Sequence, residues 1–113
     1  MTARNKKKKP SIHSQITGSL RQIWLRCDAR KEALARCKVR GIGNGHLCEW
    51  CGQLTVKPEV DHMTPVGVAP GSRNWTDETW DGYIARLLYV RPEELQVLCR
   101  ECHLIKTEED RNR

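Results

Sequence analysis

Two Cys-x2-Cys pairs are the residues of this chain best suited to hold a metal ion. Cys48 and Cys51 form the first pair, Cys99 and Cys102 form the second, and 47 residues separate the two. Both have the spacing of a zinc knuckle, and together they can complete one tetrahedral four-thiolate site. Such a site leaves Zn²⁺ no open position for a substrate. The sequence therefore predicts a structural zinc ion.

One aspartate and two histidines lie inside or directly after this cysteine frame. Asp61 and His62 are adjacent, and His103 follows Cys102. Histidine suits proton transfer because its unperturbed pKa of about 6.5 lies near neutral pH. A carboxylate oxygen and an imidazole nitrogen can share a divalent cation and leave most of its coordination positions open. The alternatives are a surface turn for the Asp-His pair and zinc ligation for His103, although adjacent helical residues such as Cys102 and His103 point in different directions.

Length and composition predict one small domain with a modest core. The chain has 113 residues, only 5% of them aromatic, and contains no Phe. Domains of this size bury a limited fraction of their surface, so a metal ion would add needed stability. Cys27 and Cys37 lack the paired spacing, and we expect them to be buried helix-face thiols.

Positive charge is concentrated in the first third of the chain. The net charge is +6, but residues 1–40 contain 12 Lys or Arg and 2 acids, whereas residues 41–113 contain 8 and 12. A basic segment of this kind supplies the phosphate contacts from which most sequence-independent nucleic-acid affinity comes. Improved solubility is the simpler alternative.

No apolar stretch approaches the roughly 18 residues of a membrane span. The basic start is not followed by an apolar run, so we expect no signal peptide and a cytoplasmic protein. Thiols are reduced in that compartment, which favours a metal site over disulfides.

Helical periodicity dominates the first part of the chain. Residues 1–13 carry the run Lys6 to Lys9 followed by Pro10 and read as a disordered basic arm. Apolar residues then recur at helical spacing over 14–40, with a possible break and a new N-cap at Asp28. We expect one interrupted helix or two short ones, and Trp24 on its apolar face.

Two short strands and two helices are expected in residues 41–113. A strand begins near Glu59 and ends at Asp61 and His62, a loop covers 63–74, and Thr76 caps a helix whose apolar face includes Trp80. A second strand covers 95–98, and a final helix covers 99–109. We expect Trp80 in the core and His13 and His46 at the surface, and leave Trp50 and Trp75 open.

These motifs, in this order, resemble the HNH endonuclease family in its compact phage and bacterial form. The resemblance extends from about residue 40 to residue 107, and residues 80–87 look like those of the phage subgroup. The matching residues are Cys48-x2-Cys51-Gly52, Val60-Asp61-His62-Met63-x-Pro65 and Leu95-Gln96-Val97-Leu98-Cys99-x2-Cys102-His103-x2-Lys106-Thr107.

The resemblance implies an α+β fold: a ββα-metal, or His-Me finger, core with a four-cysteine zinc knot and an N-terminal basic helical extension. The nuclease domain would cover 14–113, with the helical segment at 14–40 and the zinc-stapled core at 41–113. By family analogy, His62 is the general base, and Asp61 and His103 hold one Mg²⁺, Mn²⁺, Ni²⁺ or Zn²⁺ ion. The implied activity is hydrolysis of double-stranded DNA to a 5′ phosphate and a 3′ hydroxyl, with a phage terminase as a possible partner in genome packaging.

Glu94 departs from the family pattern, which has Asn at this position. The Asn side chain both donates and accepts hydrogen bonds, whereas an ionised carboxylate only accepts. Glu94 could keep half of that role, act as an extra cation ligand, or impair the enzyme. The rival interpretation is therefore a catalytically impaired zinc-knuckle module that binds DNA, and a purely structural zinc domain ranks last. Lys106 could contact phosphate or simply be an exposed charge.

Overall fold

The computed structural model describes residues 9–71 and 79–112, which form helices and two small antiparallel sheets. The elements, in chain order, are α1 (Ile12–Arg26), α2 (Asp28–Cys37), β1 (His46–Leu47), β2 (Leu54–Thr55), β3 (Glu59–His62), α3 (Trp80–Leu88), a 3₁₀ turn η1 (Pro92–Glu94), β4 (Leu95–Leu98) and α4 (Arg100–Arg111).

The basic segment is two helices, as one of the two alternatives predicted. The chain becomes extended at Cys27, and α2 starts at Asp28, whose carboxylate lies in the first turn, where the helix dipole favours negative charge. The residue that caps α2 is therefore Cys27, one position before the predicted cap. Helix α1 also starts earlier than predicted, because the Ser11 side chain accepts a hydrogen bond from the backbone N–H of Ser14. His13, which we assigned to a disordered arm, is helical.

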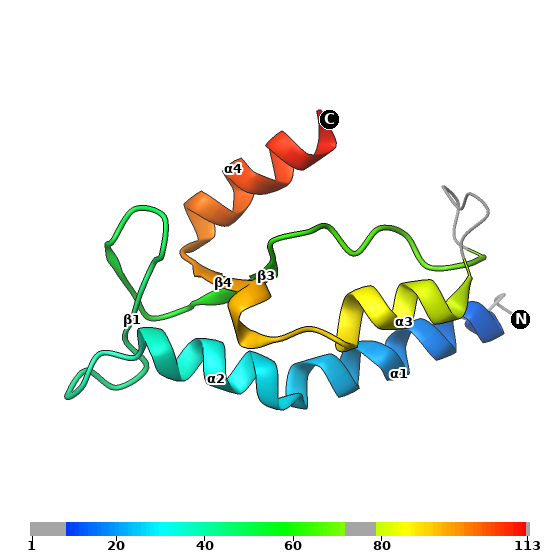
Figure 1. Ribbon diagram of the computed structural model, residues 1–113, viewed down its shortest axis with the longest axis horizontal. Coiled ribbons are helices and arrows are strands. Elements are labelled where there is room, and N and C mark those ends of the chain that lie inside the picture. Colours follow the sequence, from blue (N-terminus) through cyan, green and yellow to red (C-terminus); the bar gives the residue numbers. More distant parts are fainter. Residues whose placement is uncertain (1–8, 72–78, 113) are drawn as a thin grey trace, which may run out of the picture.

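Strands β3 and β4 pair antiparallel at the centre of the molecule, close to the predicted bounds. Glu59 lies opposite Leu98, and His62 lies opposite Leu95. One face of the sheet carries Leu95 and Val97, which are fully buried against α2. The other face is turned towards α4, because successive strand residues point to opposite sides. Figure 1 shows the pair between α2 and α4.

Helix α3 packs against α1, and the two helices contribute to an apolar cluster separate from the one between α2 and β4. Its buried members are Leu20, Ala69, Tyr83 and Leu87. Trp24 and Trp80 pack against it partly buried, so the core prediction for both Trp residues is confirmed in part. Thr79 caps α3. The predicted cap Thr76 lies outside the described residues, as does Trp75.

Of the two histidines expected at the surface, one is exposed and one is not. His13 is exposed and stacks on Trp80 at a centroid distance of 6.2 Å. His46 was predicted wrongly: only 5% of it is exposed, and its Nδ1 lies 2.8 Å from the Asn44 carbonyl oxygen. Its position in β1, beneath the turns that follow α2, accounts for this burial. No helix in the described part of the chain is both long and apolar enough to cross a membrane.

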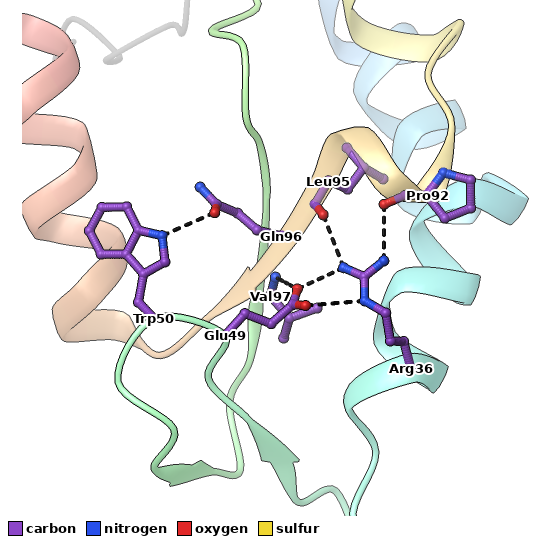
Figure 2. Close-up of polar contacts among 7 residues, drawn as sticks. All are labelled: Arg36, Glu49, Trp50, Pro92, Leu95, Gln96 and Val97. Atoms are coloured by element: carbon purple, nitrogen blue, oxygen red, sulfur yellow. Dashed lines mark hydrogen bonds and ion pairs between the residues drawn. The ribbon is translucent and has the colours of Figure 1, made fainter.

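A polar network joins α2 to the first cysteine pair and to β4 (Figure 2). The Arg36 guanidinium donates to both carboxylate oxygens of Glu49, at 3.2 and 2.7 Å. It also donates to the carbonyls of Pro92 and Leu95, at 3.1 and 3.0 Å. A planar fork of this kind suits Arg better than Lys. The hydrogen bonds that Arg36 donates to Glu49 raise the pKa of Arg36 above its ordinary value.

Glu49 completes this network from its place inside the Cys-x2-Cys turn. Its backbone N–H donates to the Val97 carbonyl, and its carboxylate accepts the Val97 N–H, both at 2.8 Å. Trp50, next in the chain, donates from its ring nitrogen to the buried Gln96 side chain at 3.0 Å. These hydrogen bonds attach the first cysteine pair to β4 without the help of a metal ion.

We predict that Arg36→Lys destabilises the fold by about 1–2 kcal/mol, a modest figure because the Arg36 and Glu49 side chains are each about one-third exposed. A lysine ammonium is a single point donor and leaves the Pro92 or Leu95 carbonyl without its partner. Urea unfolding at neutral pH measures the change. Arg26→Lys, at an exposed position in the last turn of α1, is the matched control, and equal stability of the two variants would contradict the role assigned to Arg36.

Candidate metal centre

The four cysteines of the two pairs form one cluster. The Sγ atoms of Cys48, Cys51, Cys99 and Cys102 all lie within 4.8 Å of one another. Cys48 and Cys102 are buried, Cys99 is half-buried, and Cys51 is exposed. The donors are four soft thiols at mutual distances that suit a single tetrahedral ion such as Zn²⁺. This cluster can hold a metal ion, as the sequence predicts.

The first pair lies in the turn between β1 and β2. Leu47 pairs with Leu54, and the Cys48 N–H donates to the Gln53 carbonyl at 2.9 Å. Within the turn, the Cys51 N–H points at the Cys48 sulfur at 3.5 Å. Gly52 then adopts a φ of +76°, a conformation that other residues rarely take. The sequence Cys-x2-Cys-Gly thus forms the tight turn expected of a zinc knuckle.

The second pair lies at the start of α4. Cys99 is the N-cap, and its sulfur accepts a hydrogen bond from the Cys102 backbone N–H at 3.5 Å. Because β4 ends directly before Cys99, an ion in the cluster fixes α4 against the sheet.

The thiols cannot all ionise without a cation. Burial opposes ionisation of Cys48, but backbone N–H groups outweigh that effect and lower the pKa of its thiol to about 6. Burial together with the neighbouring thiols raises the pKa of Cys102 to about 12. A bound divalent ion would allow all four thiols to ionise, because its charge stabilises every coordinating thiolate.

Asp61 and His103, the two predicted ligands of a catalytic cation, lie next to each other. Asp61 is on the α4 side of β3, and its Oδ1 is 3.6 Å from Nε2 of His103. The other ring nitrogen of His103, Nδ1, lies 3.6 Å from Oε1 of Glu59, which is two residues before Asp61 on the same face of the strand. The fold therefore brings one imidazole between two carboxylates.

Lys106 also belongs to this group: the prediction of an exposed helix charge is wrong, and contact with a phosphate stays a prediction. It is buried, and its Nζ lies 2.9 Å from Asp61 Oδ2 and 2.6 Å from Asp110 Oδ2. Burial disfavours its charge, but the carboxylates of Asp110 and Asp61 outweigh that effect and raise the pKa of Lys106. Lys106 is therefore an internal cation, held one helical turn beyond His103.

His62 lies on the opposite face of the sheet from Asp61. Its ring packs on Trp24 of α1 at a centroid distance of 4.3 Å, and its Nε2 lies 2.9 Å from the Leu87 carbonyl of α3. A carbonyl only accepts hydrogen bonds, so Nε2 carries the proton and Nδ1 holds the lone pair of the neutral ring. The structure does not group His62 with Asp61 and His103.

Glu94 is close to His62 rather than to the acidic group on β3. Its carboxylate accepts from the Arg91 backbone N–H at 2.9 Å, and this bond lowers the pKa of Glu94. His62 and Glu94 both line a cavity of about 240 Å³. The Glu94 backbone carbonyl accepts the Met63 N–H at 3.0 Å and so holds the segment that follows His62. A backbone bond therefore supports this loop, whatever the side chain at position 94.

Sequence reasoning missed Glu59 and Asp110. Glu59 was detectable, because residues two apart on a strand share a face and Asp61 had been singled out. Asp110 was detectable as the partner four residues after Lys106 on a helix. The burial of Lys106 had no comparable signal, because it depends on β3 packing against α4.

We predict that the four clustered thiols are protected from thiol reagents only while a metal ion is bound to them. In zinc-loaded protein, a thiol reagent should modify half-buried Cys27 readily and Cys37 slowly, because burial raises the pKa of the Cys37 thiol. Chelation should expose four further thiols. Zinc content per chain should fall in Cys48→Ser and stay unchanged in Cys27→Ser, the matched control. An unchanged thiol count after chelation would rule out the metal site.

Comparison with family models, with curated proteins and with solved structures gives no match to this chain.

Proposed function

We propose that this protein is a metal-dependent endonuclease that hydrolyses DNA phosphodiester bonds on a zinc-stapled ββα-metal core. The observation that carries the proposal is the approach of Asp61 to His103 across β3 and α4, at 3.6 Å, beside the four-cysteine cluster. The residues concerned are those through which the chain resembles HNH endonucleases. Their order in the sequence and their proximity in space therefore agree.

The chemistry of the acidic group suits a divalent cation. Asp61 and His103 supply one hard oxygen and one imidazole, a set accepted by Mg²⁺, Mn²⁺, Ni²⁺ or Zn²⁺. One carboxylate oxygen nearby, Oε2 of Glu59, is buried without a hydrogen-bond partner among the described residues. Buried carboxylate oxygens of this kind favour a positive ligand. When bound, the cation would polarise the scissile phosphate and stabilise the leaving 3′ oxygen.

His62 is the proposed general base, and its surroundings set a condition on that role. Nδ1 holds the lone pair, so a neutral His62 can accept the proton of an attacking water there. To act on a phosphate next to Asp61 and His103, the ring has to leave the Leu87 carbonyl and turn towards α4. β3 ends at His62, so this movement involves one side chain at a strand end.

The basic helices supply a surface for the DNA backbone. Arg21 and Arg26 of α1 and Lys31 of α2 are exposed, and α1 contains no acidic residue. Exposed Lys and Arg contact phosphates without reading sequence. Binding through them should weaken steeply with salt, because each phosphate contact releases counterions.

The deciding experiment is cleavage of supercoiled plasmid by zinc-loaded protein with EDTA, Mg²⁺, Mn²⁺, Ni²⁺ or added Zn²⁺. We expect nicked or linear product that requires a cation. The cleavage rate of His62→Ala should be lower than that of wild type by a factor of about 100 or more, since a positioned base contributes at least that factor. His13→Ala, which removes an exposed histidine, is the matched control and should cleave normally. Zinc content and circular dichroism verify that each variant is folded.

A zinc-knuckle module that binds DNA without cutting it is the second candidate. Two observations favour it: Lys106 forms an ion pair with Asp61, and His62 faces the side of the sheet away from His103. The first occupies a proposed cation ligand, and the second keeps the proposed general base away from a phosphate bound there. Glu94 in place of the family Asn fits the same interpretation.

The same samples separate the two candidates. Intact plasmid in every lane, with salt-dependent retardation of DNA on a gel, would support the binding module and contradict the nuclease. Glu94→Asn then tests whether the substitution at this position causes the loss, because restored cleavage would trace the impairment to one carboxylate. Absence of both cleavage and retardation would contradict both candidates.

A further inference from the structure

The carboxylate of Glu59 lies next to the ring of His103, and the proposed function assigns no role to this contact. The Oε1 atom of Glu59 lies 3.6 Å from Nδ1 of His103, while Nε2 of the same ring lies 3.6 Å from Asp61. Glu59 and Asp61 are two residues apart on β3, so both side chains leave the same face of the strand about 7 Å apart along the chain. The ring of His103 lies between them, with one nitrogen towards each carboxylate.

The two nitrogens of a neutral imidazole have different roles, which makes this orientation significant. One carries a proton and donates, and the other holds the lone pair that binds a cation. Histidine ligands of metals generally donate their N–H to a carboxylate or carbonyl, which fixes the tautomer and the plane of the ring. At 3.6 Å, Oε1 of Glu59 is slightly beyond hydrogen-bond distance from Nδ1, so a small side-chain adjustment would make Glu59 that acceptor, and Nε2 would then direct its lone pair towards Asp61.

The charge balance of the group is consistent with this role. Glu59, Asp61 and Asp110 bring three carboxylates, and Lys106 brings one ammonium. With His103 neutral, the group has an excess of two negative charges, which a divalent cation would neutralise. Oε2 of Glu59 is buried and has no hydrogen-bond donor among residues 9–71 and 79–112. Oε1, the oxygen nearer to Nδ1, belongs to a side chain that is 41% exposed as a whole, so this carboxylate remains available as an acceptor.

We propose that Glu59 is a positioning residue: its carboxylate accepts the Nδ1 proton of His103 and so presents Nε2, together with Asp61, to a divalent cation. The inference rests on the proposed function for the identity of the cation site. It adds a residue that acts through His103 and does not itself touch substrate. Glu59 thereby selects one of the two tautomers of His103.

The test compares Glu59→Ala with Glu59→Gln in zinc-loaded protein, without DNA. Nitrogen-15 NMR of the histidine rings, recorded before any Mn²⁺ is added, reports the tautomer of His103. Calorimetric titration then gives the Mn²⁺ dissociation constant. The amide oxygen of Gln can still accept the Nδ1 proton, so Gln should rescue what Ala loses. Glu93→Ala removes an exposed carboxylate outside this group and is the matched control.

We expect wild type, Glu59→Gln and Glu93→Ala to keep the proton on Nδ1, and Glu59→Ala to shift it towards Nε2. Mn²⁺ binding should weaken about 10- to 100-fold in Glu59→Ala, the usual effect of losing such a partner. Glu59→Gln should stay within a few-fold of wild type. Rescue by Gln assigns the effect to the hydrogen-bond acceptor and not to the negative charge, because both variants lack the charge.

Three results would overturn the proposal. The tautomer in Glu59→Ala could equal that of wild type, or Mn²⁺ affinity could be unchanged in that variant. Glu59→Gln could also bind Mn²⁺ as weakly as Glu59→Ala while keeping the Nδ1 proton, which would make Glu59 a direct ligand. If wild type binds no Mn²⁺, the cation site of the proposed function fails, and the tautomer comparison alone decides the role of Glu59.

Discussion

The convergence of four thiols on one point is the constraint from which the rest of the structure follows. The two pairs are separated by 47 residues, and their sulfur atoms lie within 4.8 Å. Joining chain ends this far apart removes conformational freedom from the unfolded state, worth about 4 kcal/mol for a covalent cross-link of similar loop length. One pair lies in the turn between β1 and β2, and the other lies at the start of α4. A metal ion there fixes the orientation of α4, and with it His103 and Lys106.

The alternation of side chains in the β3–β4 pair divides the chemistry of the protein between two faces. On the α2 face lie Leu95 and Val97, which are fully buried, together with His62. On the α4 face lie Glu59 and Asp61. Only the thickness of one sheet separates the side chains on the two faces, and Asp61 and His62 are adjacent in β3. The nuclease proposal therefore depends on His62, the last residue of its strand, where a change of rotamer needs no break in the sheet.

The N-terminal helices have a structural task besides the electrostatic one proposed for them. Several of their basic residues are exposed, as a phosphate-binding surface requires, but Arg36 is not among the available charges. Its guanidinium is held by Glu49 and by the carbonyls of Pro92 and Leu95. Glu49 belongs to the first Cys-x2-Cys turn, so the same fork attaches α2 to the metal-binding end of the molecule (Figure 2). Counting positive residues in the sequence overstates the charge offered to a partner.

The sequence by itself determined the four clustered thiols, and the strand β4 and helix α4 on either side of the start of the second pair, but not β1 and β2, which flank the first pair. Spacing fixes the thiols of a knuckle, and periodicity fixes the faces of β4 and α4, because both are properties of consecutive residues. It also singled out Asp61 and His103, which tertiary packing brings together. Only the tertiary structure decided that Glu59 adjoins His103, that Lys106 is buried beside Asp61, and that His62 faces α1 and α3. These relations join residues distant in the chain, and the packing of α4 on β3 and of α1 and α3 on the other face determines them.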